Sequence, residues 1–326
     1  MNKTCKTCGC EVDIMNIASC VKCNEIICED CAVSNKFRCN TCNPNQKQEF
    51  NLDFIRRSHI EDYKDCPYHF YLEVIKGLEV PPNIYAQVGI DLHDLYENYQ
   101  RQNISDEELR FESVQAVERL RGQFDDELIN KMLDKAKKAT EGFLGIIPSL
   151  TNKIVALEET IFFEVKNGLP KVRITMDRID EDENGDLHLH DWKTGKVMVG
   201  KHLMQNLQVP LYIHACQEHY GKPVKSFTLY YVSEREKGGA IKSRKYNHVH
   251  GDEYVCTVRK KSYTIKLSDT IKEVQAIFAR IKAGRFSIPD RPNYFKCNNC
   301  HFKETGQCAN SDVQPWINAN QKDWEM

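Results

Sequence analysis

The pattern of apolar and polar residues changes twice along the chain, and each change marks a predicted region. Residues 1–45 are dense in cysteine and lack a helical or strand period. From Ser58 onward apolar residues recur near every 3.6 positions, which predicts a helix. Three further helices are predicted over residues 84–99, from the capping pair Ser105 and Glu108, and over residues 125–148.

After residue 150 the apolar residues follow a strand pattern. Three strands separated by turns are predicted over residues 154–165, 171–180 and 186–192. A helix over 201–219, which Pro210 should interrupt, and a strand over 226–233 come next. A hairpin within 254–267 and a helix from Ser268 to Gly284 follow. This mixture predicts an α/β chain with helices packed on a sheet.

Composition and charge narrow the class of protein. The chain has 326 residues, with 28% charged and 41% hydrophobic, as in globular proteins. It has no apolar run long enough to span a membrane and no signal peptide, so we expect an intracellular, cytoplasmic protein in which thiols stay reduced. Residues 91–191 hold 23 acidic and 13 basic residues, whereas residues 222–303 hold 7 acidic and 18 basic ones. This asymmetry fits either an anionic partner for the later region or ordinary solvated surface charge.

The stretch LHLHDWKTGK at 187–196 carries candidate chemistry. Asp191 and Lys193 lie on the same face of a predicted strand, at its end. A hairpin would bring Asp177 of the preceding strand close to Asp191, and two close carboxylates favour a bound cation. Oxygen ligands select Mg²⁺ or Mn²⁺, which lowers the pKa of bound water, and Lys193 could position that water. A lone Asp-x-Lys pattern is more often a surface ion pair.

Further polar residues accompany this pattern on neighbouring elements. His93 lies on a predicted helix and could complete the metal site, although a single histidine is more often structural. Gln208 and Tyr212 are four residues apart, on one helix face. Glu158 and Glu159 on the first strand are possible extra acidic groups, but solvent-facing strand residues are the commoner interpretation.

The order of these motifs resembles the PD-(D/E)XK nuclease superfamily, in its RecB/AddB-type branch, which includes CRISPR-associated exonucleases with an iron–sulfur cluster. The resemblance covers residues 58–310 and implies a restriction-endonuclease-like core: a central mixed sheet flanked by helices. It implies that His93, Asp177 and Asp191 bind the metal, that Lys193 assists the water, and that Gln208 and Tyr212 support the site. Many members have Glu where this chain has Asp191.

Four cysteines flank the nuclease core: Cys66, Cys297, Cys300 and Cys308. Four thiolates suit either a [4Fe–4S] cluster or zinc. The resemblance implies the cluster, although the Cys300–Cys308 gap is slightly longer than in related members. Cys216 and Cys256 lack such partners and are expected to be buried.

The first 45 residues contain four CxxC pairs: Cys5 with Cys8, Cys20 with Cys23, Cys28 with Cys31, and Cys39 with Cys42. Eight thiolates make two tetrahedral Zn²⁺ sites, without which so short a segment cannot fold. Alternating pairing would resemble a cross-brace module, and sequential pairing is the alternative. We therefore predict a two-zinc module over 1–45, a linker over 46–57, and a nuclease domain over 58–326.

The combined expectation is a Mg²⁺- or Mn²⁺-dependent deoxyribonuclease, an exonuclease acting on single-stranded or end DNA in repair, recombination, replication or defence. The zinc module suggests a protein partner, because it has few basic residues for phosphate binding. No phosphate-binding GxxxxGK[ST] motif is present, so helicase activity would have to come from a partner. The alternatives are a non-catalytic DNA-binding subunit and a zinc-based adaptor of a larger complex.

Overall fold

A computed structural model describes most of the chain beyond residue 51. The described residues are 3–5, 11–12, 17–20, 23, 25–28, 52–81, 83–166, 168–289 and 294–308. The chain divides into two compact units. The first contains Met1–Leu52, Ser58–Val80 and Ala276–Met326, and the second contains Asp53–Arg57 and Pro81–Gln275. The predicted boundaries at residues 45 and 57 stay predictions, because residues 46–51, half of the predicted linker, lie outside the described residues.

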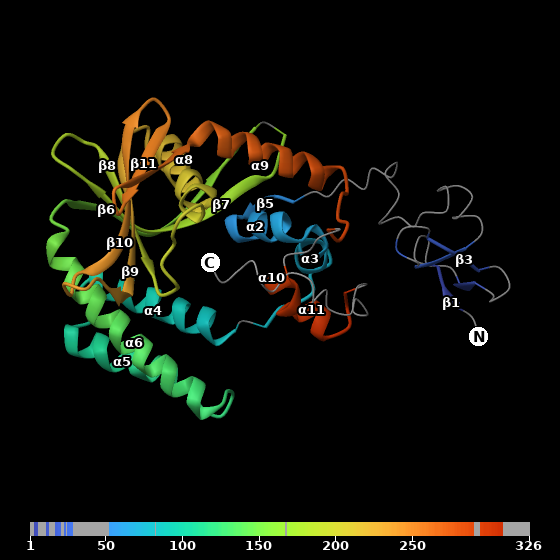
Figure 1. The fold of residues 1–326 in the computed structure, drawn as a ribbon, viewed down its shortest axis with the longest axis horizontal. Coiled ribbons are helices and arrows are strands. Elements are labelled where there is room, and N and C mark those ends of the chain that lie inside the picture. The colour runs from blue at the N-terminus through green and yellow to red at the C-terminus, as the bar shows by residue number, and fades with distance from the viewer. Residues whose placement is uncertain are drawn as a thin grey trace. The chain divides into compact units, whose positions relative to one another are not determined.

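The second unit is built on a mixed sheet of eight strands (Figure 1). Its order is β12-β11-β10-β9-β8-β7-β5, and β6 pairs with the other edge of β7. β5–β7 and β8–β9 are parallel pairs, and the other pairs are antiparallel. The strands are β5 (Phe54–Arg56), β6 (Lys153–Phe163), β7 (Lys171–Glu181), β8 (Leu187–Lys193), β9 (Val224–Arg235), β10 (Ile241–His250), β11 (Glu253–Val258) and β12 (Lys261–Lys266).

Helices cover both faces of this sheet. Phe227 and Val232 lie on opposite faces of β9, because they are an odd number of residues apart. Phe227 stacks on Tyr212 of α8, whereas Val232 belongs to the core formed with α4 and α6. Figure 1 shows α4, α5 and α6 side by side. The helices of this unit are α4 (Ile84–Gln100), α5 (Asp106–Glu118), α6 (Asp126–Ile146), the short η3 (Ile147–Ser149), α7 (His202–Gln205), α8 (Gln208–Tyr220) and the first part of α9 (Leu267–Lys282).

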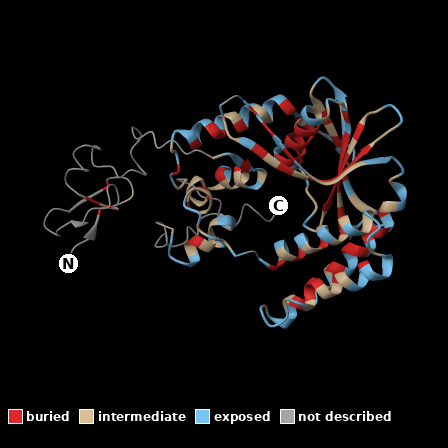
Figure 2. Ribbon diagram, turned by 180° about the vertical axis from the view of Figure 1, so that it is seen from behind, coloured by how far each residue is buried: buried red, intermediate tan, exposed pale blue. Residues whose placement is uncertain are grey.

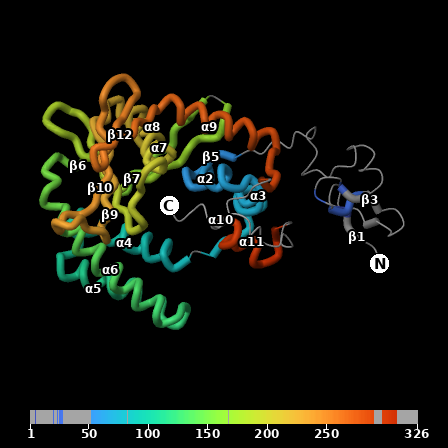
Figure 3. Tube along the Cα trace, viewed as in Figure 1, coloured from blue at the N-terminus to red at the C-terminus, as the bar shows by residue number. Residues whose placement is uncertain are grey.

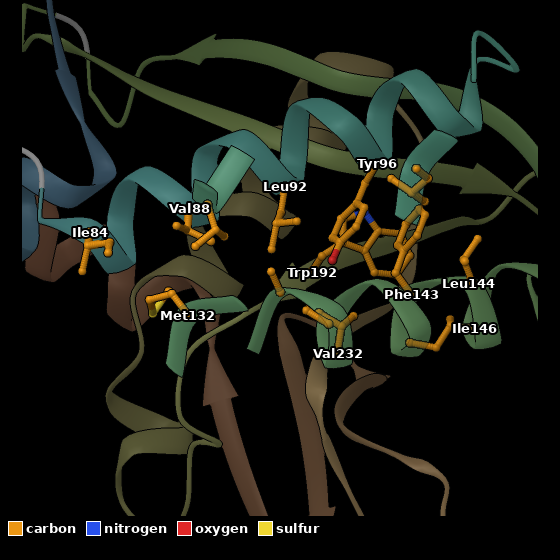
Figure 4. Packing of buried hydrophobic residues seen from close by; sticks show 14 of the residues in the cluster. Ile84, Val88, Leu92, Tyr96, Met132, Phe143, Leu144, Ile146, Trp192 and Val232 are labelled. Carbon is orange, nitrogen blue, oxygen red and sulfur yellow. The ribbon is translucent and has the colours of Figure 1, made fainter. Parts of the chain in front are cut away.

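The main apolar core lies between α4, α5, α6 and the sheet (Figure 4). Leu92 and Tyr96 of α4 are almost fully buried there, with Phe143 of α6 and Trp192 of β8. The ring of Phe143 stacks on Tyr96 at 4.0 Å and meets Trp192 edge-on at 5.1 Å between centroids. Aromatic packing of this kind fixes α4 and β8 relative to each other.

Local sequence signals determine where these helices begin. Asn83 caps α4 and Asp125 caps α6, each by accepting a hydrogen bond from a backbone N–H of the first turn. The predicted capping box of α5 is confirmed, because Ser105 and Glu108 exchange both hydrogen bonds. Figure 2 shows that the buried residues gather on the central strands and the exposed ones on the outer sides of the helices.

The described parts of the first unit include α2 (Arg57–Asp65, apart from Arg57), α3 (Pro67–Phe70), the π-helical turn η2 (Tyr71–Ile75), the last part of α9, α10 (Tyr294–Asn298) and α11 (His301–Glu304). Tyr63, Phe70 and Phe286 form an aromatic cluster, with Phe70 stacked on Phe286 at 6.1 Å. The Tyr63 hydroxyl donates to the Arg285 carbonyl at 2.6 Å. This cluster joins segments more than 200 residues apart in the sequence.

Four short strands form two antiparallel pairs near the N-terminus: β1 (Lys3–Thr4), β2 (Glu11–Val12), β3 (Ile17–Ser19) and β4 (Ile26–Cys28). Cys5 and Cys20 are buried there. Of the other predicted zinc ligands, Cys8, Cys31, Cys39 and Cys42 lie outside the described residues. The two-zinc module stays a prediction.

The predicted sheet with flanking helices is confirmed. The three-strand meander appears as β6, β7 and β8, and the predicted hairpin as β11 and β12, with Arg259 and Lys260 at positive φ in its turn. Other details differ. β5 and β10 are not predicted, and α9 begins at Leu267, where Asp252 accepts hydrogen bonds from the backbone of Leu267 and Ser268. The helix expected over 201–219 is split into α7 and α8 before Gln208, and Pro210 lies in the first turn of α8, where its missing N–H breaks no helical hydrogen bond. Among the described residues no helix combines the length and apolar run of a membrane span.

Candidate active site

The candidate site lies where β7 and β8 separate. The ladder between them ends at the pair Arg178–His190, whereas β8 stays paired with β9 as far as Lys193. The first residues of β7 pair instead with β5 (Figure 3). Beyond the last ladder pair, the Trp192 N–H donates to the carboxylate Oδ2 of Asp177 at 2.6 Å. The buried Asp177 carboxylate thus accepts the backbone hydrogen bond of Trp192 at the point where the β7–β8 ladder has ended.

Core packing positions the polar residues beside it. Leu92 and Trp192 belong to the apolar core (Figure 4). Their sequence neighbours His93, Asp191 and Lys193 are consequently held in place by elements that cannot shift without opening the core.

His93, Glu158 and Asp177 form a compact group of potential metal ligands. One ligand atom from each residue lies within 4.8 Å of the others. The His93 Nδ1 atom is 3.4 Å from Asp177 Oδ1 and 3.7 Å from Glu158 Oε1. Ligand atoms on one octahedral ion with bonds of about 2.1 Å are separated by about 3 to 4 Å. Two carboxylates and one imidazole at these distances fit Mg²⁺ or Mn²⁺. Among the described residues this is the only such group.

Burial and charge shift the pKa values of this group. Burial raises the pKa of Asp177 to about 6, with His93 opposing the rise and Asp191 adding to it. Burial alone would lower the pKa of His93, but the carboxylate of Asp177 and hydrogen bonds to Asp177 and Glu158 raise it well above its usual value. Without a cation from outside, the imidazolium is the positive charge that compensates the carboxylates.

Glu158 occupies a strained backbone position. Its φ is +48°, in the left-handed region that non-glycine residues rarely adopt, and it lies in the middle of β6. Its neighbours Leu157 and Glu159 pair with Arg178 and Met176 of β7. Strain inside a strand points to a functional constraint. The strand pattern favours a solvent-facing position for Glu158, but its side chain is only 21% exposed and faces His93.

Asp191 lies next to this group and is held from two sides. Lys193 Nζ is 2.8 Å from Asp191 Oδ2, and the side-chain amide of Gln208 donates to Asp191 Oδ1. Asp191 is buried, whereas the Lys193 side chain is 29% exposed. Asp191 also interacts electrostatically with His93 and Asp177. The structure thus brings together five of the predicted residues, although the group within 4.8 Å contains Glu158 in place of Asp191.

Tyr212, the sixth predicted residue, lies one helical turn after Gln208 on α8. Burial raises the pKa of its phenol, and Arg57 is hydrogen-bonded to it. Sequence analysis did not single out Arg57, because it precedes the first recognised motif. Tyr212 also interacts electrostatically with Asp191 and Asp177, so α8 contributes two polar side chains on the same side.

A second buried network supports the two strands. Arg178 donates two hydrogen bonds to Asp180, at 2.7 and 2.9 Å, and His190 lies 3.3 Å from the same carboxylate. Arg178 also donates to Gln100 and to the Leu150 carbonyl. These hydrogen bonds join β7 to α4 and to the segment after α6, so the role of this network is structural.

The four core-flanking cysteines lie in the first unit. Burial raises the pKa of the Cys66 thiol, hydrogen bonds from the backbone of His69 and Tyr68 lower it, and Cys308 and Cys300 raise it, so both of these cysteines interact with Cys66. Burial would raise the pKa of Cys300 as well, but a hydrogen bond from His69 at 3.4 Å lowers it. A lowered thiol pKa favours the thiolate that metal binding requires.

Comparison with known proteins identifies the family of this chain. No curated protein matches the chain. Seventeen solved chains match its structure, among them the crystal structure of SSO0001, with a TM-score of 0.37 and 12% identity over 82% of this chain and 87% of that one. A family model matches residues 57–305, which include His93, Glu158, Asp177, Asp191, Lys193, Gln208 and Tyr212 but not Cys308. The chain belongs to the PD-(D/E)XK nuclease superfamily.

Proposed function

We propose that this protein is a RecB-type, metal-dependent deoxyribonuclease that hydrolyses phosphodiester bonds as an exonuclease on single-stranded or end DNA. Membership of the superfamily indicates a metal-dependent nuclease. The observation that carries the proposal is the adjacency of the His93, Glu158 and Asp177 group to the Asp191–Lys193 ion pair. An exposed ion pair alone would not imply catalysis.

His93 and Asp177 are the proposed ligands of Mg²⁺ or Mn²⁺, together with Asp191 from the adjoining strand and Glu158. A bound ion of this kind would acidify a water molecule and neutralise charge on a phosphate. The carboxylates supply the oxygen ligands that such hard cations prefer. Asp177 is held in orientation by the Trp192 N–H, so one of its oxygens is committed to the backbone and the other faces His93.

Lys193 is the proposed catalytic amine. Its ion pair with Asp191 holds the ammonium beside the ligand group, and its partial exposure lets it reach a substrate phosphate. There it would orient the attacking water and offset the charge that develops on the phosphate. Gln208 fixes the rotamer of Asp191, and Tyr212 with Arg57 completes the polar lining from α8.

Two further cofactors belong to the proposal. Cys66, Cys297, Cys300 and Cys308 would hold a [4Fe–4S] cluster with a structural role. The N-terminal CxxC pairs would hold two Zn²⁺ ions in a module that docks a protein partner. Proximity of Cys66, Cys300 and Cys308 supports the first assignment. The alternative function is a non-catalytic DNA-binding or zinc-based adaptor subunit of a larger complex, but an intact catalytic set favours the enzyme.

The decisive experiment is cleavage of end-labelled single-stranded and double-stranded DNA with Mn²⁺ by wild type and by Lys193→Ala. We expect the substitution to lower the cleavage rate about 10²- to 10³-fold, the effect of losing one charge-stabilising group. DNA binding and metal content should stay nearly unchanged. Lys196→Ala, an exposed lysine of the same turn, is the matched control and should cleave normally. Equal cleavage by wild type and Lys193→Ala would reject this active site.

A separate measurement tests the cluster. Protein purified without oxygen should contain iron and acid-labile sulfide, with the visible absorption of an iron–sulfur cluster, and Cys300→Ser should lose both. A colourless preparation that contains zinc alone would reject the iron assignment.

A further inference from the structure

The outer end of the sheet carries an exposed aromatic and basic surface. Phe54 of β5 and Phe162 of β6 flank the start of β7, with exposed fractions of 38% and 48%. Arg56, Lys171 and Arg173 accompany them. We call these five residues the Phe54–Phe162 patch. All of them belong to the second unit.

Strand register places the patch on one face of the sheet. Arg173 is opposite Phe162 on β6 and opposite Arg56 on β5, and Lys171 is opposite Phe54. The intervening residues Val172 and Ile174 are buried. Because alternate residues of a strand face opposite sides, the patch forms the outward face whose reverse lies in the core.

The patch has the geometry of a stacking surface. The rings of Phe54 and Phe162 meet edge to face at 5.5 Å, and the Arg173 guanidinium lies over the Phe54 ring at 5.8 Å. Phe162 is the more exposed of the two rings, and a guanidinium plane can itself stack on a base. Two exposed phenylalanines beside three cations are unusual for a solvated face and typical of a surface that binds single-stranded nucleic acid.

The charges of the patch are available to a ligand. Within the described part of the chain, no carboxylate lies within ion-pair distance of Arg56, Lys171 or Arg173. Two exposed acidic residues adjoin the patch: Asp53, whose carbonyl accepts from the Lys171 N–H, and Glu164 beyond the end of β6. The three cations of the patch therefore outnumber these two carboxylates by one, and phosphates would neutralise the excess positive charge.

The same strand face leads from the patch to the metal-ligand group. Along β7 the outward residues are Arg173, Thr175 and then Asp177, and along β6 Phe162 and Thr160 precede Glu158. Thr160 and Thr175 are opposite each other, with their hydroxyls 3.1 Å apart and exposed. Four residues of a strand span about 13 Å. Even a strand with fully stacked bases would cover that distance in about four nucleotides.

We propose that the Phe54–Phe162 patch binds the single-stranded substrate within about four nucleotides of the bond that is cut. A base stacks on the Phe162 ring, Arg173 and Lys171 contact the flanking phosphates, and the Thr160–Thr175 hydroxyls lie along the path to the metal site. This inference rests on the proposed function for the position of the cut, but the binding surface itself is independent of catalysis. It commits to a single nucleic-acid strand, because a duplex would hide the base faces that stacking needs.

Binding is measured by fluorescence anisotropy with a labelled oligothymidylate, in the Lys193→Ala background and without divalent metal. We expect the double substitution Phe54→Ala with Phe162→Ala to raise Kd roughly 5- to 150-fold, the equivalent of about 1–3 kcal/mol for one stacked base. Phe111→Ala is the matched control, because Phe111 is an exposed phenylalanine of α5. Arg173→Gln should reduce the slope of log Kd against log salt by about 0.7, the value for one phosphate. Thermal unfolding of the double variant is followed alongside, because both rings are about half covered, and Kd is compared only under conditions in which the variant stays folded.

A second arm locates the contact. An abasic residue is moved one nucleotide at a time along a substrate with a defined cut site, and cleavage is followed in otherwise wild-type protein and in Phe162→Ala. A loss of cleavage at one position within about four nucleotides of the cut, present in wild type and absent in Phe162→Ala, supports the proposal. Unchanged Kd in the double substitution would overturn it, as would an equal effect of Phe111→Ala. If the double substitution raises Kd as expected but neither wild type nor any variant cleaves DNA, the patch is a binding surface and the proposed nuclease activity is rejected.

Discussion

Glu158 combines an unfavourable backbone conformation with a position in the ligand group. A non-glycine residue in the left-handed region costs about 1–3 kcal/mol, and the φ of Glu158 is +48°. The conformation turns its carboxylate towards His93, 3.7 Å away, in a group already crowded by Asp177. This conformation therefore makes the strand less stable at Glu158 than an ordinary extended residue would. A bound metal ion would offset that cost.

Substitution of Glu158 should separate metal binding from stability. We expect Glu158→Gln to weaken Mn²⁺ binding about 10-fold or more, because one anionic ligand is lost. The adjacent Glu159→Gln should bind as wild type, since Glu159 lies outside the ligand group. Titration followed by the electron paramagnetic resonance of free Mn²⁺ measures both.

Glycine provides the complementary test of the strain. Glu158→Gly should leave the free energy of unfolding in metal-free buffer unchanged or raised, because glycine adopts positive φ at little cost. Glu159→Gly, at an ordinary strand position, should lower it by about 1 kcal/mol. Urea unfolding of the two variants decides the matter: equal destabilisation would mean that Glu158 is not strained.

The residues of the site differ in how far sequence could predict them. Asp191 and Lys193 are recognisable because a two-residue spacing puts both on one strand face. His93 and Asp177 need the order of motifs along the chain. Glu158 and Glu159 are both possible acidic groups from sequence, but the pair could not be told apart, because the distinguishing signal is the backbone dihedral angle of Glu158.

At the scale of elements, α6 and β9 approach each other unusually closely. Gly142 of α6 faces β9: a Cβ atom there would be 1.9 Å from the Val232 carbonyl oxygen. Since that contact is with backbone, no side-chain rotation can relieve it. The helix that covers Trp192, and with it the end of β8, therefore depends on the absence of one methyl group.

Alanine substitutions in α6 test this contact. Gly142→Ala should destabilise the protein by more than about 3 kcal/mol, since the strand or the helix must move. Gly145→Ala, in the same helix with no atom near its Cβ, should instead stabilise it by up to about 1 kcal/mol through helix propensity. Thermal unfolding gives both values, and similar effects of the two changes would show that the approach is not tight.

The same scale shows why some elements escaped prediction. The sequence of β10 is IKSRKYNHVH, in which Arg244 and Tyr246 are the buried side chains, so it lacks apolar alternation. β10 is specified by pairing with β9 and β11 on either side. β5 has three residues and forms a parallel pair with β7, more than 100 residues away, which no local pattern encodes. The start of α9 depends on Asp252, 16 residues before Ser268.

At the scale of the whole molecule, the first unit joins an early segment of the chain to a late one. Asp65 pairs with Lys296, and His69 contacts Cys300, each across 231 residues. Cross-linking a loop of this length removes about 5 kcal/mol of chain entropy from the unfolded state. The described helices α3, α10 and α11 have four or five residues each and would not be stable in isolation. The proposed metal centre on the four cysteines would cross-link these segments and add to the stability that the aromatic cluster of Tyr63, Phe70 and Phe286 provides.

Loss of that centre should consequently unfold one unit and leave the other. In Cys300→Ala, we expect hydrogen exchange to become fast in residues 58–80 and 276–308, while β7, β8 and β9 of the second unit keep their protection. Gln307→Ala, an exposed change beside Cys308, is the control and should leave both units protected. Retained protection around residues 58–80 in Cys300→Ala would mean that the aromatic cluster of Tyr63, Phe70 and Phe286 suffices without a metal. Uniform loss across both units would mean instead that they fold as a single cooperative body, and that the cysteines stabilise the nuclease sheet as well.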